Sequence, residues 1–165
     1  MIEESKTTVL GIDPGLSGGI VVYQLDFGVT ATHKMPETEM DVWELFESIS
    51  LRHSKNSVTA YVEKITGFVG GKGPPGSKMF VMGANYGGLR MACLGNAIRL
   101  VEVTAPTWQK ALGIPKKDKA DSQTKWKNLL KGKAQQLFPN LKITLAFSDA
   151  LLIAEYGKLK EQGKV

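Results

Sequence analysis

The pattern of hydrophobic and polar positions alternates along the chain between two periods, one typical of β-strands and one typical of amphipathic helices. Short runs of β-branched and apolar residues, bounded by turn residues, predict strands at 7–12, 18–25, 29–35, 58–63 and 99–103. Apolar residues that recur every three or four positions predict helices at 40–51, 78–95, 125–138 and 148–160. A shorter helix is expected from Pro106, because proline favours the first helical position.

The order of these elements predicts one α/β domain over residues 1–165. Only turns separate the first three strands, so we expect an antiparallel meander. The strand at 58–63 follows a helical crossover and is expected to run parallel to an earlier strand. Thr38 and Ser148 stand at the starts of helical patterns and are expected to cap them. The segment 66–78 is rich in glycine and contains two prolines, which predicts a loop.

Composition and charge narrow the class of protein. A chain of 165 residues with 42% hydrophobic and 22% charged residues is typical of one compact globular domain. Lys and Arg number 21 against 16 Asp and Glu, and much of the excess lies in 110–133. This basic segment is either a solvated helix face or a surface for an anionic partner.

Cysteine usage and hydropathy exclude other classes. The chain has one cysteine, Cys93, in an apolar run, which excludes an internal disulfide framework and a cysteine-based zinc site. No stretch reaches the roughly 20 apolar residues that cross a bilayer, and the start of the chain is polar and acidic, unlike a signal peptide. We therefore expect a cytoplasmic protein without a membrane partner.

Acidic residues stand at positions where a carboxylate is costly to bury. Asp13 and Glu63 end two predicted strands, and open α/β sheets bind ligands beyond the carboxyl ends of their strands. Asp149 is predicted in the first turn of the last helix, where the helix dipole favours its anionic form. Taken singly, Asp13 could merely cap the turn at Pro14 and Gly15, and Asp149 could merely cap its helix.

Brought together, these carboxylates would repel one another, and a divalent cation is the usual reason that such a cluster persists. Hard oxygen ligands favour Mg²⁺ or Mn²⁺. Two ions about 4 Å apart can activate a water and stabilise the leaving oxygen of a phosphoryl displacement. The basic segment would then hold a phosphate backbone.

Several motifs, in their order and spacing, identify a resemblance. They are GIDPG at 11–15, the strand-ending Glu63, PTWQK at 106–110, LFP at 137–139 and SDALLIA at 148–154. Together they resemble the RuvC-like Holliday-junction resolvases of the ribonuclease-H superfamily, particularly phage members. The resemblance covers nearly the whole chain.

The resemblance implies a ribonuclease-H-like mixed five-stranded sheet with antiparallel first three strands and helices on both faces. It also implies a homodimeric, phage-encoded crossover junction endodeoxyribonuclease that acts on branched DNA in the bacterial cytoplasm, with two Mg²⁺ or Mn²⁺ ions per site. Asp13, Glu63 and Asp149 match three of the family's catalytic metal ligands. A basic catalytic residue is matched by Lys125, with Lys119 or Lys127 as alternatives.

One position departs from the family pattern. Bacterial members carry a further acidic residue three positions before the last aspartate, where this chain has Ala146. Asp118, Asp121 or a backbone carbonyl could substitute, the chain could be a catalytically impaired branched-DNA-binding protein, or three carboxylates could suffice. We favour the last interpretation.

Predicted DNA contacts lie in the glycine-rich loop and in the basic segment. Phe68 is expected to insert near the junction centre, because stacking on an unpaired base contributes about 1–3 kcal/mol. The lysines expected to bind DNA are Lys72, Lys78, Lys117, Lys119 and Lys127. Residues 70–73 lack the spacing of a phosphate-binding loop, so no nucleotide cofactor is expected. An actin-like or sugar-kinase-like ATP-binding fragment would need two lobes, for which the chain is too short.

Overall fold

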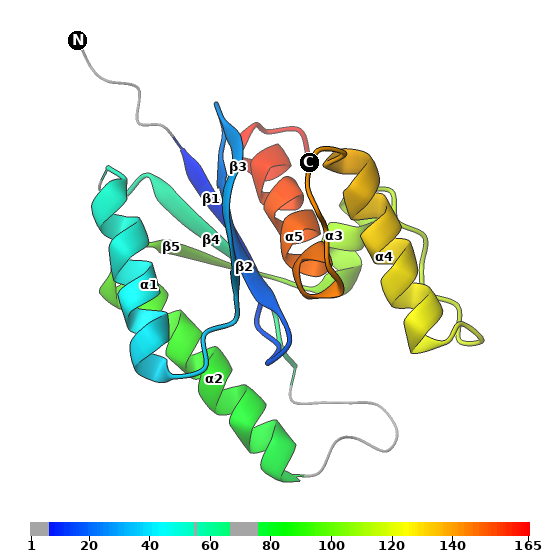
Figure 1. Cartoon of the computed structure of the whole chain (residues 1–165), viewed down its shortest axis with the longest axis horizontal. Helices are drawn as coiled ribbons and strands as arrows, with labels where there is room; N and C mark the ends of the chain where they lie inside the picture. The colour runs from blue at the N-terminus through cyan, green and yellow to red at the C-terminus, as the bar shows by residue number, and fades with distance from the viewer. Residues whose placement is uncertain (1–6, 55, 67–75) are drawn as a thin grey trace.

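The computed structural model describes residues 7–54, 56–66 and 76–165, and its centre is a mixed sheet. The five strands lie in the order β3-β2-β1-β4-β5 (Figure 1). Their bounds are β1 (Thr8–Asp13), β2 (Gly19–Gln24), β3 (Gly28–Lys34), β4 (Val58–Glu63) and β5 (Arg99–Val103). The first three strands pair antiparallel, whereas β4 runs parallel to both β1 and β5. The predicted mixed five-stranded α/β sheet is confirmed.

Helices cover both faces of the sheet (Figure 1). They are α1 (Glu39–Arg52), α2 (Gly76–Gly95), α3 (Ala105–Ala111), α4 (Gln123–Leu137) and α5 (Leu145–Glu161). The helices α1 and α2 pack on one face, and α3, α4 and α5 pack on the other. Among the described residues, no helix is both long and apolar enough to span a membrane.

Strand alternation divides the core into two layers. Leu10 and Ile12 of β1 face α1 and α2, where they pack with the fully buried Phe46. Val9 faces the opposite layer, which includes Trp108 of α3 and most of α5. Asp13 lies two residues beyond Gly11 and four beyond Val9, so its side chain belongs to the α5 side of the sheet.

The helix α5 is the most buried helix of the described chain. Residues 150–157 are buried without interruption, so this helix is enclosed around most of its circumference and has no strongly polar face there. Two glycines allow it to approach the sheet. A β-carbon at Gly11 would stand 2.2 Å from the Ala150 carbonyl oxygen, and one at Gly157 would stand 2.6 Å from the Tyr61 ring. The backbone of α5 therefore rests directly on β1.

The predicted cap of α1 is confirmed and that of α5 is wrong. Thr38 caps α1 by accepting a hydrogen bond from the Asp41 amide at 3.1 Å. The helix α5 begins at Leu145, one turn before Ser148, with Thr144 as the N-terminal flanking residue. Ser148 is inside the helix, and its hydroxyl donates to the Leu145 carbonyl at 3.1 Å. Serine can satisfy its hydroxyl in this way within a helix, which removes its value as a marker of the start.

Replacement of Gly11 by alanine should destabilise the protein strongly. The new methyl group would overlap the backbone of α5, and overpacking of a core costs typically about 1–3 kcal/mol, more where backbone must move. Gly132→Ala is the matched control, because Gly132 lies inside α4 with open space around its α-carbon and should stabilise the helix by about 0.5–1 kcal/mol. Urea unfolding of both variants measures the difference. Equal stability of Gly11→Ala and the wild-type protein would contradict the close packing.

Candidate active site

Three carboxylates from distant parts of the chain converge at one edge of the sheet. Asp13 ends β1 and Glu63 ends β4, and these strands are parallel neighbours, so their carboxyl ends meet at the same edge. Asp149 comes from α5, which rests on β1. Charge repulsion from Asp13 acts on both Glu63 and Asp149, and repulsion from Asp149 also acts on Glu63. The three side chains therefore form one electrostatic unit, the carboxylate cluster.

Burial dominates the acid–base behaviour of the carboxylate cluster. Loss of solvation, reinforced by the neighbouring Asp13 charge, raises the pKa of Glu63 from 4.5 to about 7. The same two causes raise the pKa of Asp149 from 3.8 to about 6. Burial also raises the pKa of Asp13, against the lowering effects of the Gly15 amide and the Lys127 charge. At neutral pH, an added positive charge would therefore be strongly favoured here.

Each carboxylate is oriented by a hydrogen bond from its surroundings. The Gly15 amide donates to Asp13 Oδ1 at 3.2 Å, and the Ser148 hydroxyl donates to Asp149 Oδ1 at 3.0 Å. Glu63 Oε2 accepts from the indole Nε1 of Trp108 at 3.0 Å. The first two donors are each close in sequence to the carboxylate that they contact, but Trp108 reaches Glu63 from α3, the helix that follows β5.

Trp108 is a site residue that the sequence analysis missed. Its apolar ring is almost fully buried in the α5 layer. A buried indole N–H usually needs an acceptor, and that requirement is the signal that could have connected Trp108 with a carboxylate. Its partner could not be read from the sequence, because 45 residues separate it from Glu63.

Among the described residues, Lys127 is the lysine whose charge acts on the carboxylate cluster. Its charge lowers the pKa of both Asp13 and Asp149, in opposition to burial. Lys125, the first choice from the sequence, instead forms an ion pair with Asp121 at 2.5 Å. Residues two positions apart project to different sides of a helix, so Lys125 and Lys127 of α4 cannot both face the cluster. The charge that acts on the carboxylates is thus that of Lys127, whereas Lys125 pairs with Asp121.

The remaining predicted residues lie in three different settings. Phe68 and Lys72 lie outside the described residues. Lys78 is exposed in the first turns of α2, beside the turn that follows Asp13. Lys117 hydrogen-bonds to Gln123 at the start of α4, and Lys119 is exposed in the same basic segment.

The acidic residues proposed as substitutes for a fourth ligand have partners away from the carboxylate cluster. Asp121 pairs with Lys125, and Asp118 Oδ1 accepts from the Ala120 amide at 2.9 Å. Ala146 lies in the first turn of α5, where its carbonyl oxygen would be 3.2 Å from a β-carbon placed at Gly19. The start of α5 therefore packs tightly on β2 at Ala146.

The donor set of the carboxylate cluster fits a hard divalent cation, because it consists of oxygen ligands whose mutual repulsion a cation would relieve. Within the part of the chain that the structure describes, no three acidic, histidine or cysteine side chains are arranged closely enough to hold one ion. Charge and ligand chemistry therefore support Mg²⁺ or Mn²⁺, whereas the side chains of the carboxylate cluster are not arranged around one common point.

Comparison with known proteins identifies the fold. No family model and no curated protein sequence matches the chain. The chain is similar to Thermus thermophilus RuvC in complex with a Holliday junction substrate, with a TM-score of 0.64, 16% identity and coverage of 96% of this chain and 97% of that one. It has the RuvC fold. A second structure of RuvC from T. thermophilus matches with a TM-score of 0.58, 14% identity and coverage of 96% and 98%. Because both identities are low, the likeness to RuvC is one of architecture.

The raised pKa of Glu63 predicts a pH-dependent stability for the metal-free protein. The contribution of Glu63 to the free energy of unfolding is fully present below about pH 4.5, where Glu63 is protonated in both the folded and the unfolded state. This contribution is lost as the pH rises through about 7. The rise from 4.5 to about 7, at 1.36 kcal/mol per pH unit, corresponds to at most about 3 kcal/mol. Glu63→Gln should therefore match the wild type at pH 4 and exceed its stability at pH 8.

Urea unfolding in EDTA at pH 4, 6 and 8 measures this effect. The matched control is Glu47→Gln, which removes the same charge from the exposed side of α1. A constant stability difference between Glu63→Gln and the wild type across this range would show that Glu63 is not held in a desolvated, acidic environment.

Proposed function

We propose that this protein is a metal-dependent endodeoxyribonuclease that resolves four-way or other branched DNA junctions. The observation that carries the proposal is the convergence of Asp13, Glu63 and Asp149 in a partly buried, mutually repelling cluster at the carboxyl edge of the sheet. The similar T. thermophilus RuvC has been solved with a Holliday junction substrate, and the match extends over nearly the full length of both chains. Fold, ligand chemistry and surface charge support the same activity.

The carboxylate cluster and two residues beside it would have separate roles in phosphodiester hydrolysis. Asp13, Glu63 and Asp149 would hold Mg²⁺ or Mn²⁺, two ions per site, which supply Lewis-acid stabilisation of the phosphoryl oxygens and activation of water. Trp108 fixes the orientation of Glu63 through its indole N–H. Lys127 would place a positive charge beside the scissile phosphate, the role that the sequence first suggested for Lys125.

Positive charge on two sides of the carboxylate cluster suits a DNA backbone. The N-terminal ends of α2 and α4 lie at the same end of the molecule as the carboxyl end of β1 (Figure 1). We propose that Lys78 on the α2 side and Lys117, Lys119 and Lys127 on the α4 side contact phosphates. The predicted contacts of Phe68 and Lys72 belong to the same proposal and lie outside the described residues.

Resolution of a junction requires two symmetrically placed nicks, and therefore a homodimer is part of the proposal. Support comes from an exposed apolar side of α2, where Phe80, Met91 and Leu94 are 78%, 63% and 60% exposed. Ala84 and Gly87 lie between them at helical spacing, so a second helix could approach closely. The resemblance of the motifs to phage members makes action in the cytoplasm of a bacterial host a further part of the proposal.

A second candidate function is binding of branched DNA without cleavage. Two observations favour it, namely Ala146 at the position of the extra carboxylate and the absence, among the described residues, of three ligands close enough for one ion. The two functions differ in a single assay, because both proteins would bind junctions but only a nuclease would cut them.

The wild-type protein should cleave a synthetic four-way junction when Mg²⁺ or Mn²⁺ is added. Asp13→Asn and Glu63→Gln should reduce the cleavage rate by more than about 100-fold, because each removes a ligand charge from the site, while junction binding in EDTA remains. The matched control is Asp26→Asn in the β2–β3 turn, at the opposite end of these strands. Gel-based cleavage and binding assays measure both properties.

The outcome separates the two candidate functions. Junction binding without cleavage in either metal would contradict the nuclease and support the binding protein. A gain of cleavage in Ala146→Asp would then identify the missing carboxylate as the cause.

Substitution of Lys125 and substitution of Lys127, both in α4, should have unequal effects on cleavage. Lys127→Gln removes the charge that acts on Asp13 and Asp149, so single-turnover cleavage at saturating protein should slow by about 100-fold. Lys125→Gln removes an exposed ion pair with Asp121 and should change the rate by less than about fivefold. The reverse order of effects would restore Lys125 as the catalytic lysine.

A further inference from the structure

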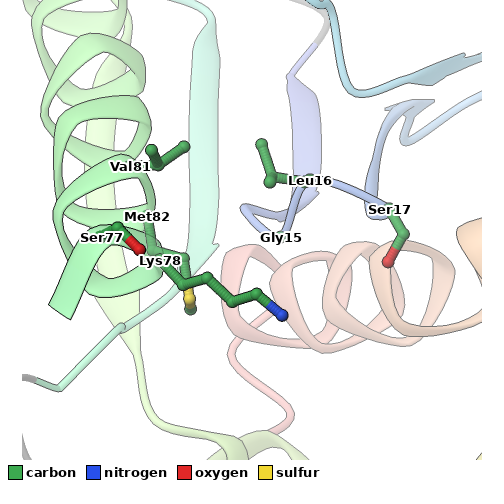
Figure 2. Close-up of a pocket in the computed structure, with 7 residues that line it drawn as sticks. All are labelled: Gly15, Leu16, Ser17, Ser77, Lys78, Val81 and Met82. Carbon is green, nitrogen blue, oxygen red and sulfur yellow. The ribbon is translucent and has the colours of Figure 1, made fainter. Parts of the chain in front are cut away.

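A cleft adjoins the carboxylate cluster on its α2 side. Its volume is about 430 Å³, and it separates the turn between β1 and β2 from the first turns of α2 (Figure 2). The residues that line it are Gly15, Leu16, Ser17, Ser77, Lys78, Val81 and Met82. In Figure 2, Val81 and Leu16 face each other across the cleft, and the Lys78 side chain extends from α2 toward the turn.

The lining of the cleft combines apolar walls with one positive charge. Leu16 is 65% exposed and Val81 is 43% exposed, so these side chains present apolar surface to water on both sides of the space. Met82 adds a thioether, which contacts aromatic rings favourably. Among the described residues of the lining, Lys78 is the charged one and none is acidic. This combination suits a flat aromatic ring that is attached to an anion.

The same turn connects the cleft with the carboxylate cluster. The Gly15 amide donates to Asp13 Oδ1 at 3.2 Å, while Gly15 and its neighbours Leu16 and Ser17 line the cleft. A strand whose phosphate lies at the carboxylates would therefore carry its next nucleotide over this turn. The adjacent nucleotide, rather than an independent small molecule, is the occupant that this continuity favours.

We propose that the cleft receives one unpaired nucleobase of branched DNA, next to the phosphate at the carboxylate cluster. Leu16, Val81 and Met82 contact the two faces of the base, and Lys78 contacts the phosphate that follows it. The proposal rests on the proposed nuclease function and adds a basis for substrate selection. A base pair at a branch point lacks a continuous stack on one side, so its base enters an apolar pocket at lower cost than a base within a continuous duplex.

Abasic substitution along the junction tests the proposal. Four-way junctions that lack one base at successive positions around the cleavage site are titrated with the full-length protein in EDTA. Because burial of the faces of one base between aliphatic side chains, at about 25 cal/mol per Å² of apolar surface, contributes on the order of 1–2 kcal/mol, one position should weaken wild-type binding by about 5–30-fold. The variants Met82→Ala and Leu16→Ala, from opposite walls, should bind the intact junction more weakly and lose most of the penalty at that position.

Two further variants separate the base from the phosphate and from general effects. Lys78→Gln should weaken binding by the same factor for intact and abasic junctions, because the phosphate remains when the base is removed. Leu51→Ala is the matched control, since Leu51 is 81% exposed near the end of α1 and does not line the cleft. It should retain the wild-type response to the abasic position. Circular dichroism checks that each variant is folded.

The outcomes distinguish this inference from the proposed function. An abasic penalty that is unchanged in both Met82→Ala and Leu16→Ala, or one that is absent at every position, would overturn the base pocket even if the wild type cleaves junctions. A changed molar mass of the cleft variants in light scattering, with an unchanged abasic profile, would assign the cleft to a second copy of the chain. Loss of the penalty in a protein that cuts nothing in Mg²⁺ or Mn²⁺ would retain the pocket and overturn the nuclease.

Discussion

Close packing of α5 on the central strand β1 is the constraint on which the candidate site depends. Gly11 leaves no room for a side chain between its strand and the backbone at Ala150 and Ala154. A helix held at this distance carries Asp149 to the strand end where Asp13 lies. Any wider separation would remove Asp149 from the repulsion that it shares with Asp13. The packing of α5 on β1 therefore also brings the charged side chains of the site together.

The carboxylate cluster stores unfavourable electrostatic energy inside an otherwise apolar layer. Desolvation and like charges raise the pKa values of Glu63 and Asp149, and the few compensating contacts come from Trp108, Ser148 and Lys127. Carboxylates whose desolvation and repulsion are only partly compensated are typical of functional sites, because a bound cation or a charged substrate supplies the opposite charge that the protein lacks there. The apolar core around α5 keeps these groups in place despite their cost.

The similarity to RuvC shows that two chains can have the same architecture with few identical residues. At 16% identity, the two chains align over 96% of this one. Five strands with suitable alternation, a glycine where the last helix crosses β1, and apolar helix faces are sufficient to specify the arrangement. Substitutions that keep these properties leave the fold unchanged.

The sequence by itself determined most of the fold. The strands at 58–63 and 99–103 agree with β4 and β5 at both ends, because alternating runs between turn residues are local signals. Strand alternation and a parallel crossover also sufficed to place Asp13 and Glu63 at one edge of the sheet. The start of α5 was harder to predict from the sequence, because the Ser148 hydroxyl finds a hydrogen-bond partner inside the helix as readily as at a cap.

Only the tertiary structure decided which side chains meet. Lys125 and Lys127 are equivalent in sequence, and the orientation of α4 determines that one pairs with Asp121 while the other acts on the carboxylates. The bond from Trp108 to Glu63 likewise depends on where α3 returns beside the sheet. Periodicity records which face of an element is apolar, but it carries no information on which residues of other elements pack against that face.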